Sequence, residues 1–490
     1  MITLNNANLS LLPQGVAAPR YDRANLMPGI VHIGCGNFHR AHQAVYLDDL
    51  FNLGEGHDFA ILGAGVRGGD AHMRGLLAQQ DWLSSVIELE PGHNKARVIG
   101  AMTDFLPVVA GNAPLIAAMA APTTKIVSLT VTEGGYYIDP TTGTFSPDHP
   151  DIQADAANPD TPDTAFGAII AALRIRRAHG VMPFTVMCCD NVPHNGSVTR
   201  DAVIGTCRLS DRELADWIAA NVAFPNSMVD RITPATGAHE RQLAQGFGLA
   251  DAAPVTCEPF RQWVMQDNFP AGRPALEKVG VTFTDHVDRY EMMKIRILNG
   301  GHAIIAYPAG LLGIEYVHEA MADPMICGFL DKVLTQEVIP HVPAVPGTDL
   351  DDYKSLIIKR FSNPEIADTT RRLCLDGSNR QPKFIVPTIA DRLAAGGDVR
   401  GLTLLSALWC RYCHGQDEDG RMIAPNDPNW QMLNQRAAAA RDRPQAWLEM
   451  ATVYGDMAGN ARFTAEFATA LDQVWRDGTR AALGDYLSQG

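Results

Sequence analysis

Residues 29–40 read GIVHIGCGNFHR. The apolar, β-branched run that ends at Gly34 is typical of a buried strand, and a helical pattern follows from about Phe38 to Phe51. We therefore predict a strand, a tight turn and a helix in this order. Such a unit is typical of the start of a sheet of parallel strands.

Three further apolar segments have the pattern of strands in the same sheet. They cover residues 59–66, 125–132 and 183–189, and a helix is expected over residues 165–178. Because these strands do not alternate in polarity and are separated by helical segments, they indicate a parallel sheet with helices on both faces. We therefore expect the N-terminal half to be a Rossmann-like, doubly wound α/β domain.

The pattern changes near residue 285. A last strand-like segment covers residues 279–283, and helical stretches follow at residues 292–306, 324–339, 389–395, 402–412, 430–441 and 463–471. We therefore predict an α/β domain over residues 1–285 and a mostly α-helical domain over residues 286–490.

Composition and charge exclude several classes of protein. The chain has 490 residues, of which 46% are hydrophobic and 19% are charged, as in folded globular proteins. A net charge of −15 without a long basic run argues against binding to nucleic acids. The nearest basic cluster is Arg174, Arg176 and Arg177, which we expect on the solvated face of a helix.

The sequence shows no targeting segment and no metal motif. No segment has the pattern of a signal peptide or the length of a membrane span, so we expect a cytoplasmic protein without a membrane partner. Nine cysteines, an odd number, argue against a disulfide framework. Cys410 and Cys413 lack a second pair that would complete a zinc site, so we expect them to be packing residues and predict no metal.

The turn that begins at residue 34 carries part of a dinucleotide-binding signature. Gly34 permits the tight turn, and Gly36 lets a diphosphate approach the backbone at the start of the following helix. His39 stands where the signature has its third glycine, so the motif is incomplete. The turn is therefore open to two interpretations, a dinucleotide site and an ordinary strand–helix connection.

An acidic residue is expected beyond the second strand of a dinucleotide-binding domain. Asp70 follows that strand and can accept hydrogen bonds from ribose hydroxyls, which would favour NAD over NADP. Arg67 lies nearby and leaves this preference open. The alternative for Asp70 is to cap a helix that begins at Ala71.

Residues 291–302 read EMMKIRILNGGH. At about 100° per residue on an α-helix, Lys294, Asn299 and His302 fall within a sector roughly 140° wide and can face one cleft. Gly300 and Gly301 each cost about 1 kcal/mol relative to alanine, which is understandable where a ligand or another backbone comes close. The alternative is close helix packing with a polar face whose groups are satisfied.

Several motifs in one order resemble the mannitol dehydrogenase family of long-chain polyol dehydrogenases. They are GCGNFHRAH at 34–42, TVTEGGY at 130–136, CDNVPHNG at 189–196, FPNSMVDR at 224–231, CEPF at 257–260, residues 294–302, and DGS at 376–378. The resemblance runs from about residue 29 to at least residue 390. It implies a metal-independent transfer of hydride between NAD and a sugar alcohol or ketose, with a lysine as general base.

The resemblance also implies a role for individual residues. Lys294 would accept the hydroxyl proton, which requires a neutral amine of the kind that burial favours. Asn191 and Asn299 would donate hydrogen bonds to the developing oxyanion. His302 would orient the substrate oxygen, and Glu291 would relay the proton to solvent. Contacts with NAD are implied for Gly34, Gly36, Asn37, Phe38, Asp70 and Glu133, and contacts with substrate for Asp230, Arg372 and His302.

Several of these residues have simpler alternatives. Asn191 ends a predicted parallel strand, where ligands of such sheets bind, but an asparagine before Pro193 also forms Asx turns. Glu291 lies one helical turn before Lys294 and can form an ordinary ion pair with it. A metal-dependent alcohol dehydrogenase and a nucleotide-sensing protein without activity are the competing classes.

The motifs leave two branches of the family open. Residues 133–136 and 191–196 resemble the polyol dehydrogenases, whereas residues 261–263 and 291–294 resemble the fructuronate reductases. We expect a polyol or ketose of the mannitol and fructose type, with fructuronate reductase and arabinitol or sorbitol dehydrogenase as alternatives. A hexuronate would need a cationic partner such as Arg261, Arg372 or Arg380. The family is compatible with a monomer.

Overall fold

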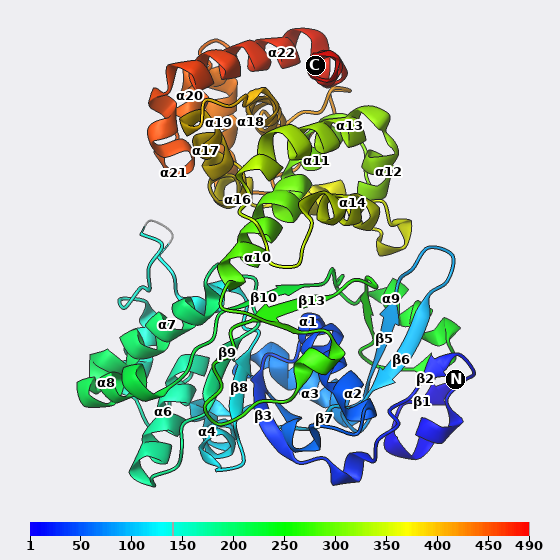
Figure 1. The fold of residues 1–490 in the computed structure, drawn as a ribbon, viewed down its shortest axis with the longest axis vertical. Helices are drawn as coiled ribbons and strands as arrows, with labels where there is room; N and C mark the ends of the chain where they lie inside the picture. Colours follow the sequence, from blue (N-terminus) through cyan, green and yellow to red (C-terminus); the bar gives the residue numbers. More distant parts are fainter. Residues whose placement is uncertain (140–141, 490) are drawn as a thin grey trace. The chain divides into compact units, whose positions relative to one another are not determined.

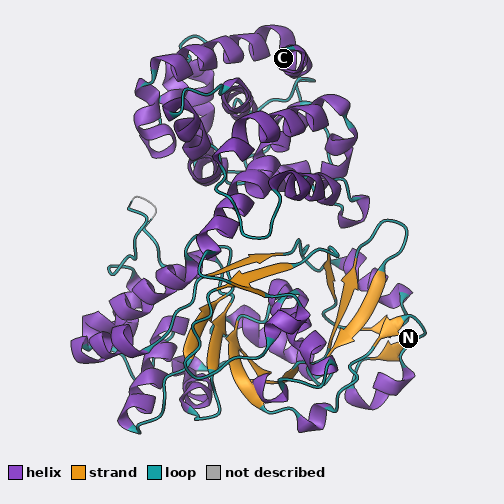
Figure 2. Ribbon diagram, in the orientation of Figure 1, coloured by secondary structure: helices purple, strands orange, loops and turns teal. Residues whose placement is uncertain are grey.

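A computed structural model of the chain describes residues 1–139 and 142–489. It divides into two compact units, Met1–Val287 and Asp288–Gly490. The first contains strands and helices, whereas the second is built of helices and loops (Figure 2). This confirms the predicted fold class, a Rossmann-like α/β region followed by a mostly α-helical one.

The central sheet of the first unit has five strands in the order β7-β4-β3-β8-β9 (Figure 1). Every neighbouring pair in this sheet is parallel. Four of its strands lie in segments that the sequence predicts, whereas the short β7 was not expected. The bounds are β3 Pro28–Ile33, β4 Ala60–Ala64, β7 Met102–Phe105, β8 Ile126–Leu129 and β9 Thr185–Cys188.

Helices cover both faces of this sheet, and successive strand residues pack into different clusters. Ile30 belongs to one buried cluster and Val31 to another, because neighbouring side chains on a strand point to opposite faces. The helix α6, Ala165–Ala178, has the predicted bounds. The other helices of this unit are α3 Gly68–Ala78, α4 Ala113–Ala120, α5 Pro150–Ala157, α7 Asn195–Ser210, α8 Arg212–Asn221 and α9 Ala238–Gly246.

The helix predicted from Phe38 to Phe51 is broken in the structure. It consists of α1, Asn37–Ala41, and α2, Gln43–Asn52, with His42 between them at φ −120° and ψ −90°. The ring of His42 is buried and its Nε2 lies 2.9 Å from the carbonyl oxygen of Gln262. The break thus lies at a residue that contacts a part of the chain 220 positions away.

Smaller sheets complete the first unit and were not predicted. A four-stranded sheet has the order β12-β5-β6-β2, with β5 and β6 antiparallel, and a three-stranded sheet has the order β10-β13-β14. The strand expected at residues 279–283 is only β14, Thr282–Phe283, because a 3₁₀ helix precedes it. The other bounds are β2 Val16–Ala17, β5 Ser84–Glu88, β6 Lys95–Ile99, β10 Ser227–Asp230, β12 Val255–Cys257 and β13 Gln262–Met265.

The expected solvated arginine face on α6 is wrong for one residue. Arg176 is buried, and its guanidinium donates to the carbonyl oxygens of Met119, Ala121, Thr124 and Met182 at 2.8–3.0 Å. The adjacent Arg177 does pair with Glu213 in an exposed position. Arg176 therefore donates to backbone carbonyl oxygens inside the protein rather than facing water.

The second unit is assembled around buried helices. The helix α22 packs along α18 and α13, and α11 also packs on α18. The bounds are α10 Val287–Met293, α11 Gly300–Leu311, α12 Val317–Ala322, α13 Pro324–Val333, α14 Leu350–Phe361, α15 Thr370–Leu373, α16 Gly377–Phe384, α17 Val386–Ala394, α18 Arg400–Cys413, α19 Trp430–Ala440, α20 Gln445–Leu448, α21 Ala451–Tyr454 and α22 Ala461–Ser488.

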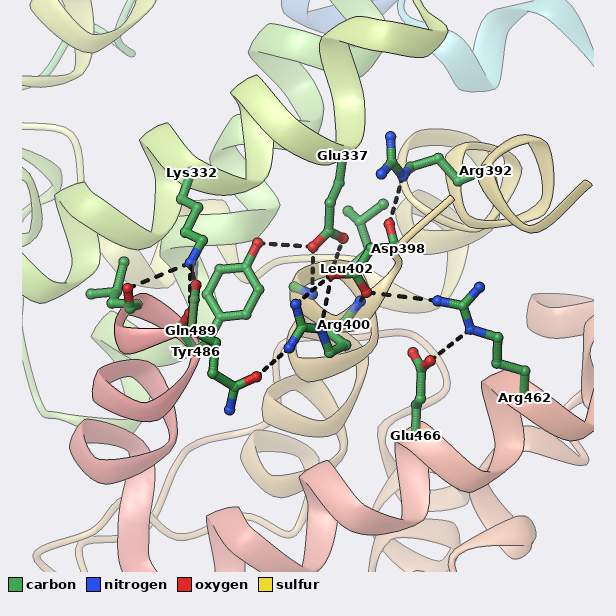
Figure 3. A network of polar contacts seen from close by, with 12 residues as sticks. Lys332, Glu337, Arg392, Asp398, Arg400, Leu402, Arg462, Glu466, Tyr486 and Gln489 are labelled. Atoms are coloured by element: carbon green, nitrogen blue, oxygen red, sulfur yellow. Dashed lines mark hydrogen bonds and ion pairs between the residues drawn. The ribbon is translucent and has the colours of Figure 1, made fainter. Parts of the chain in front are cut away.

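A buried carboxylate attaches the last helix to this unit (Figure 3). Glu337 accepts hydrogen bonds from the backbone N–H groups of Gly401 and Leu402, at 2.7 and 2.9 Å, and from the hydroxyl of Tyr486 at 2.8 Å. Burial raises the pKa of Glu337 above its usual range. The ammonium of Lys332 lies over the Tyr486 ring and donates to its carbonyl oxygen.

All nine cysteine thiols are unpaired, and both Cys410 and Cys413 are buried in α18.

Within residues 1–139 and 142–489, no helix combines the length and apolar character needed to cross a membrane.

Candidate active site

The glycine turn lies at the carboxyl end of the central strand β3. The chain leaves β3 for β4 and β7 on one side, and later returns to β8 and β9 on the other side. The order of the strands therefore reverses beside the turn, which is where ligands bind in open α/β sheets. Gly34 has φ +102°, and a Cβ there would lie 2.1 Å from the carbonyl oxygen of Thr130. A Cβ on Gly36 would meet no heavy atom of the described chain within 4 Å, so this side of the turn is open.

Two stacked imidazoles lie beneath the turn. His39, which stands in place of the third glycine, stacks on His32 with ring centroids 3.5 Å apart. Neither ring nitrogen of His39 has a hydrogen-bond partner among the described residues, and burial holds its pKa well below the usual range. His32 bonds to the hydroxyls of Ser128 and Thr130, at 2.7 and 2.9 Å, and burial lowers its pKa to about 3. Both rings are therefore neutral spacers between helix and sheet.

Two of the predicted NAD contacts are engaged within the protein. The amide of Asn37 donates to the carbonyl oxygen of Pro234 and to the hydroxyl of Thr236, at 3.1 and 2.8 Å. Phe38 stacks on His42 with centroids 4.9 Å apart. The side chains of both residues therefore have contacts within the protein.

Asp70 lies beyond the end of β4 and does cap the helix that follows, but as its third residue rather than as the residue before a helix that begins at Ala71. The helix α3 begins at Gly68 rather than at Ala71, and Oδ2 of Asp70 accepts from the backbone N–H groups of Val66 and Arg67 at 3.0 and 2.9 Å. One carboxylate oxygen therefore closes the turn. In the part of the chain that the structure describes, the other oxygen, Oδ1, has no hydrogen-bond partner.

The ends of β8 and β9 carry Glu133 and Asn191. Glu133 opens a 3₁₀ helix, Glu133–Tyr136, and its side chain is exposed. Asn191 is exposed on the loop that follows β9. Between these segments lies Asp190, whose carboxylate accepts from the backbone of Val131 and from the hydroxyl of Tyr136. Sequence reasoning missed Asp190, although it lies next to Asn191 in the CDN motif.

Asp230 is buried at the end of β10. The adjacent Arg231 holds this region, since its guanidinium donates to the carbonyl oxygens of Ala41 and Glu258 and pairs with Glu88 at 2.6 Å. Arg231 was also missed, because a buried arginine cannot be told from an exposed one by its sequence context.

In the second unit, Lys294 and Asn299 are the first and last residues of a π-helical segment. The sector calculated for a continuous α-helix is therefore wrong. A π-helix closes its turns between residues i and i+5, so Lys294 and Asn299 lie one turn apart and on the same side. Lys294 is buried, whereas Asn299 is half-buried.

The two glycines after this segment favour the packing alternative. A Cβ on Gly301 would lie 3.3 Å from Cε2 of Phe361, which is tighter than an ordinary contact. A Cβ on Gly300 would have its nearest neighbours at 3.7 Å. Gly301 therefore permits α11 to approach the end of α14.

His302 follows the glycines, and its ring stacks on Phe361. Nε2 of His302 has no hydrogen-bond partner among residues 1–139 and 142–489. Burial, together with nearby Arg372, Arg360, Arg380 and Lys294, holds the pKa of His302 well below the usual range. The structure thus gathers Lys294, His302 and Arg372, three predicted site residues, within the second unit.

The arginines considered for a hexuronate have partners already. Arg372 forms a bidentate ion pair with Asp368, and its side chain is half-exposed. Arg261 pairs with Asp49 at 2.5 Å and lies over the ring of Tyr46. Arg380 donates to a backbone carbonyl oxygen at 3.2 Å.

No group of three or more His, Cys, Asp or Glu side chains within the described residues could hold a metal ion.

The chain matches two family models. The mannitol dehydrogenase Rossmann domain matches residues 28–278, and the mannitol dehydrogenase C-terminal domain matches residues 286–475. A mannitol 2-dehydrogenase of Cereibacter sphaeroides is 67% identical over 477 residues, which cover 97% of this chain and all of that protein. A mannitol 2-dehydrogenase of Phaeosphaeria nodorum is 44% identical over 490 residues, covering 99% of this chain and 86% of that protein.

Two solved structures are similar over nearly the whole chain. The ternary complex of Pseudomonas fluorescens mannitol 2-dehydrogenase with NAD and D-mannitol superposes with a TM-score of 0.89 at 44% identity, and all of both chains is covered. A substrate-free D-sorbitol dehydrogenase has a TM-score of 0.90 at 35% identity, covering 98% of this chain and all of the other. The chain therefore belongs to the mannitol dehydrogenase family.

Proposed function

We propose that this protein is an NAD-dependent, metal-independent polyol dehydrogenase that interconverts a sugar alcohol and a ketose of the mannitol and fructose type. The observation that carries this proposal is the full-length similarity to mannitol 2-dehydrogenases, one of which is solved with NAD and D-mannitol. The glycine turn at the reversal of strand order supports it independently, because it is the place where such sheets bind nucleotides.

The residues of the first unit fit NAD. Gly36 is open toward a diphosphate, and Oδ1 of Asp70 is available to a ribose hydroxyl. The charge of Asp70 would repel a 2′-phosphate, which favours NAD over NADP. When bound, NAD supplies the nicotinamide carbon that accepts or returns a hydride. We propose that the backbone at Gly34 and Gly36, with Asp70 and Glu133, holds it.

We propose that Lys294 is the general base. Its side chain is buried, and its charge acts on the neighbouring imidazole of His302. A neutral amine can accept the hydroxyl proton during oxidation and return it during reduction. Glu291 is a proposed relay for that proton to solvent.

We propose that amide groups stabilise the oxygen from which the proton leaves. Asn299 lies one π-helical turn from Lys294, so its amide can donate to the same substrate oxygen. Asn191 has the same proposed role. Nε2 of His302 is a further donor or acceptor for a substrate hydroxyl, and Asp230 and Arg372 are proposed contacts with the remaining hydroxyls.

Charge pairing favours a neutral substrate over a hexuronate. Arg261 and Arg372 each face a carboxylate of the protein itself, Asp49 and Asp368. A substrate carboxylate at Arg261 or Arg372 would have to displace one of these partners, whereas polyol hydroxyls would not. Arg380 donates to the carbonyl oxygen of Leu373 and has no carboxylate partner among the described residues, so it is the arginine at which a hexuronate would meet no competing charge. A sorbitol-type polyol is the second candidate, which the similarity to a D-sorbitol dehydrogenase favours.

Oxidation of NADH by the purified protein tests the proposal. We expect turnover with fructose to exceed turnover with fructuronate, and NADH to be used in preference to NADPH. A preference for the keto acid would reverse the assignment of substrate. The family resemblance also leads us to propose a monomer, which light scattering would check.

A further inference from the structure

One carboxylate bridges the segments that follow two neighbouring strands. Oδ2 of Asp190 accepts from the backbone N–H of Val131 at 2.8 Å and from the hydroxyl of Tyr136 at 2.5 Å. Oδ1 accepts from the backbone N–H of Thr132 at 3.2 Å. Val131 and Thr132 follow β8, whereas Asp190 follows β9, and these strands are parallel neighbours (Figure 1). Asp190 thus ties the carboxyl ends of both strands together.

The tie acts where the backbone is unfavourable by itself. Thr132 has φ +67° and ψ 163°, a conformation that a β-branched residue rarely adopts. The hydrogen bond from its N–H to Asp190 holds it there, directly before Glu133. The 3₁₀ helix that Glu133 opens ends at Tyr136, which is buried and returns its hydroxyl to the same carboxylate. Both ends of the Glu133 segment are therefore anchored on Asp190.

The backbone of Asp190 is held as well. The amide of Asn195, a fully buried residue, donates to the carbonyl oxygen of Asp190 at 3.1 Å and to the hydroxyl of Ser227 at 3.1 Å. Asp190 immediately precedes Asn191 along the chain. Asn191 is therefore carried by a loop whose first residue is fixed through both side chain and backbone.

We propose that Asp190 is a positioning residue for hydride transfer, which holds the Glu133 segment and the Asn191 loop in one arrangement at the carboxyl ends of β8 and β9. The proposal rests on the proposed dehydrogenase function. Asp190 acts through its neighbours: its carboxylate oxygens are occupied by Val131, Thr132 and Tyr136.

The charge of this carboxylate depends on pH in a useful range. The pKa of Asp190 is raised to about 6, because burial and, to a smaller extent, the nearby carboxylate of Glu133 outweigh the hydrogen bonds from Tyr136 and the backbone, which lower it. The other titratable groups that face it, Tyr136, Cys188 and Cys189, have raised pKa values and stay protonated. A protonated oxygen accepts less well, so the tie should weaken as the pH falls below about 6.

Ketose reduction is the direction in which to test this. Lys294 has to be protonated for reduction, so its own titration causes no loss of activity on the acid side. We expect kcat/KM for NADH, measured at saturating ketose from pH 5 to pH 8, to show an acid limb with a midpoint near 6 in the wild type.

Two variants separate positioning from a general loss of structure. Asp190→Asn places an amide N–H₂ against one of the backbone N–H groups. We expect kcat/KM for NADH at pH 7 to fall about 10- to 100-fold, which corresponds to the loss of a hydrogen bond to a charged group. The acid limb should also disappear, because asparagine does not titrate. Tyr136→Phe removes a hydrogen bond that lowers the pKa of Asp190, so we expect its acid limb to move to higher pH.

Asp48→Asn is the matched control. Asp48 is a buried carboxylate of the same unit that also accepts from a tyrosine hydroxyl, Tyr21 at 2.6 Å, and from a backbone N–H, Gly100 at 3.0 Å. We expect it to lower the thermal midpoint of unfolding while the acid limb of kcat/KM stays in place. The proposal is overturned if Asp190→Asn keeps the wild-type kcat/KM and acid limb, or if Tyr136→Phe leaves the limb where it was.

Failure of the proposed dehydrogenase function can be distinguished from failure of the role proposed for Asp190. If the wild type turns over neither polyol nor ketose, the dissociation constant for NADH, followed by its fluorescence, replaces kcat/KM in the same comparison. A weaker NADH complex in Asp190→Asn than in Asp48→Asn would support the tie without any turnover, and equal affinities would overturn it.

Discussion

The imidazole of His302 lies nearly parallel to the ring of Phe361, with centroids 4.3 Å apart and planes at 20°. The same phenyl ring limits the space beside Gly301, where a Cβ would lie 3.3 Å from its edge. Phe361, at the end of α14, therefore sets both the approach of α11 and the plane of the imidazole that α11 carries.

Replacing Phe361 should disturb substrate more than cofactor. Stacking of this kind contributes about 0.5–1.5 kcal/mol, so we expect Phe361→Leu to raise KM for the polyol roughly 2- to 10-fold while KM for NAD stays unchanged. Steady-state kinetics with both substrates varied would measure this. Phe467→Leu, a buried phenylalanine of α22, is the control for a general loss of packing. An equal rise in KM for the polyol and in KM for NAD would contradict the expectation that Phe361 acts on substrate binding.

Removing the proposed base should abolish turnover without preventing cofactor binding. A positioned general base contributes about 10²- to 10⁴-fold, so Lys294→Ala should lower kcat for polyol oxidation by that factor. Activity should recover in part as the pH rises, because hydroxide can replace the amine. NADH fluorescence titration should show nearly wild-type affinity. Lys278→Ala, which removes an exposed ion pair with Glu55, is the control, and turnover equal in both variants would refute the role of Lys294.

The preference between NAD and NADP should depend on the charge of Asp70. Asp70→Asn keeps a carbonyl oxygen for the N–H groups of Val66 and Arg67 but removes the charge that repels a 2′-phosphate. We expect the ratio of kcat/KM for NADP to that for NAD to rise by at least about tenfold. Asp104→Asn in β7 is the control. An unchanged ratio would assign the choice of cofactor to other groups.

The carboxylate of Glu337 should make the stability of the protein depend on pH. Its pKa is raised in the folded state, so its contribution is fully present below the pKa of the unfolded chain and is lost as the pH rises through the folded pKa. Glu337→Gln loses one acceptor, and we expect a cost of about 1–3 kcal/mol near pH 5 that becomes smaller toward pH 8. Urea unfolding at both pH values measures this cost.

Glu466→Gln is the control for that comparison. Glu466 is half-buried and pairs with Arg462 over one helical turn, so we expect a smaller change, below about 1 kcal/mol, at either pH. A cost for Glu337→Gln that grows with pH would contradict the direction of the pKa shift.

Chelation should leave the activity intact. The described residues offer no cluster of metal ligands, and the proposed chemistry uses an amine and amides instead. Exhaustive dialysis against EDTA followed by the NADH assay would check this. A loss of activity that zinc restores would point to a metal-dependent alcohol dehydrogenase.

Local patterns in the sequence were sufficient to predict the elements that are buried on both faces. The strands β3, β4, β8 and β9 and the helix α6 lie where continuous apolar runs and helical periodicity predict them. The hairpin of β5 and β6 was missed, because its residues 84–99 mix polar and apolar side chains without a clear period. The π-helical segment was missed as well, since one extra residue in a turn leaves no mark on a short apolar pattern.

The sequence by itself determined the parallel sheet, the glycine turn and the order of the motifs, because periodicity and glycine conformation act between near neighbours. Only the tertiary structure decided the partners of the charged groups. Asp190 meets Val131 across 59 positions of the chain, and Arg176 meets Met119 across 57. Whether such a side chain is solvated or anchors a loop depends on which strands and helices become neighbours, and this is set by packing of the whole core.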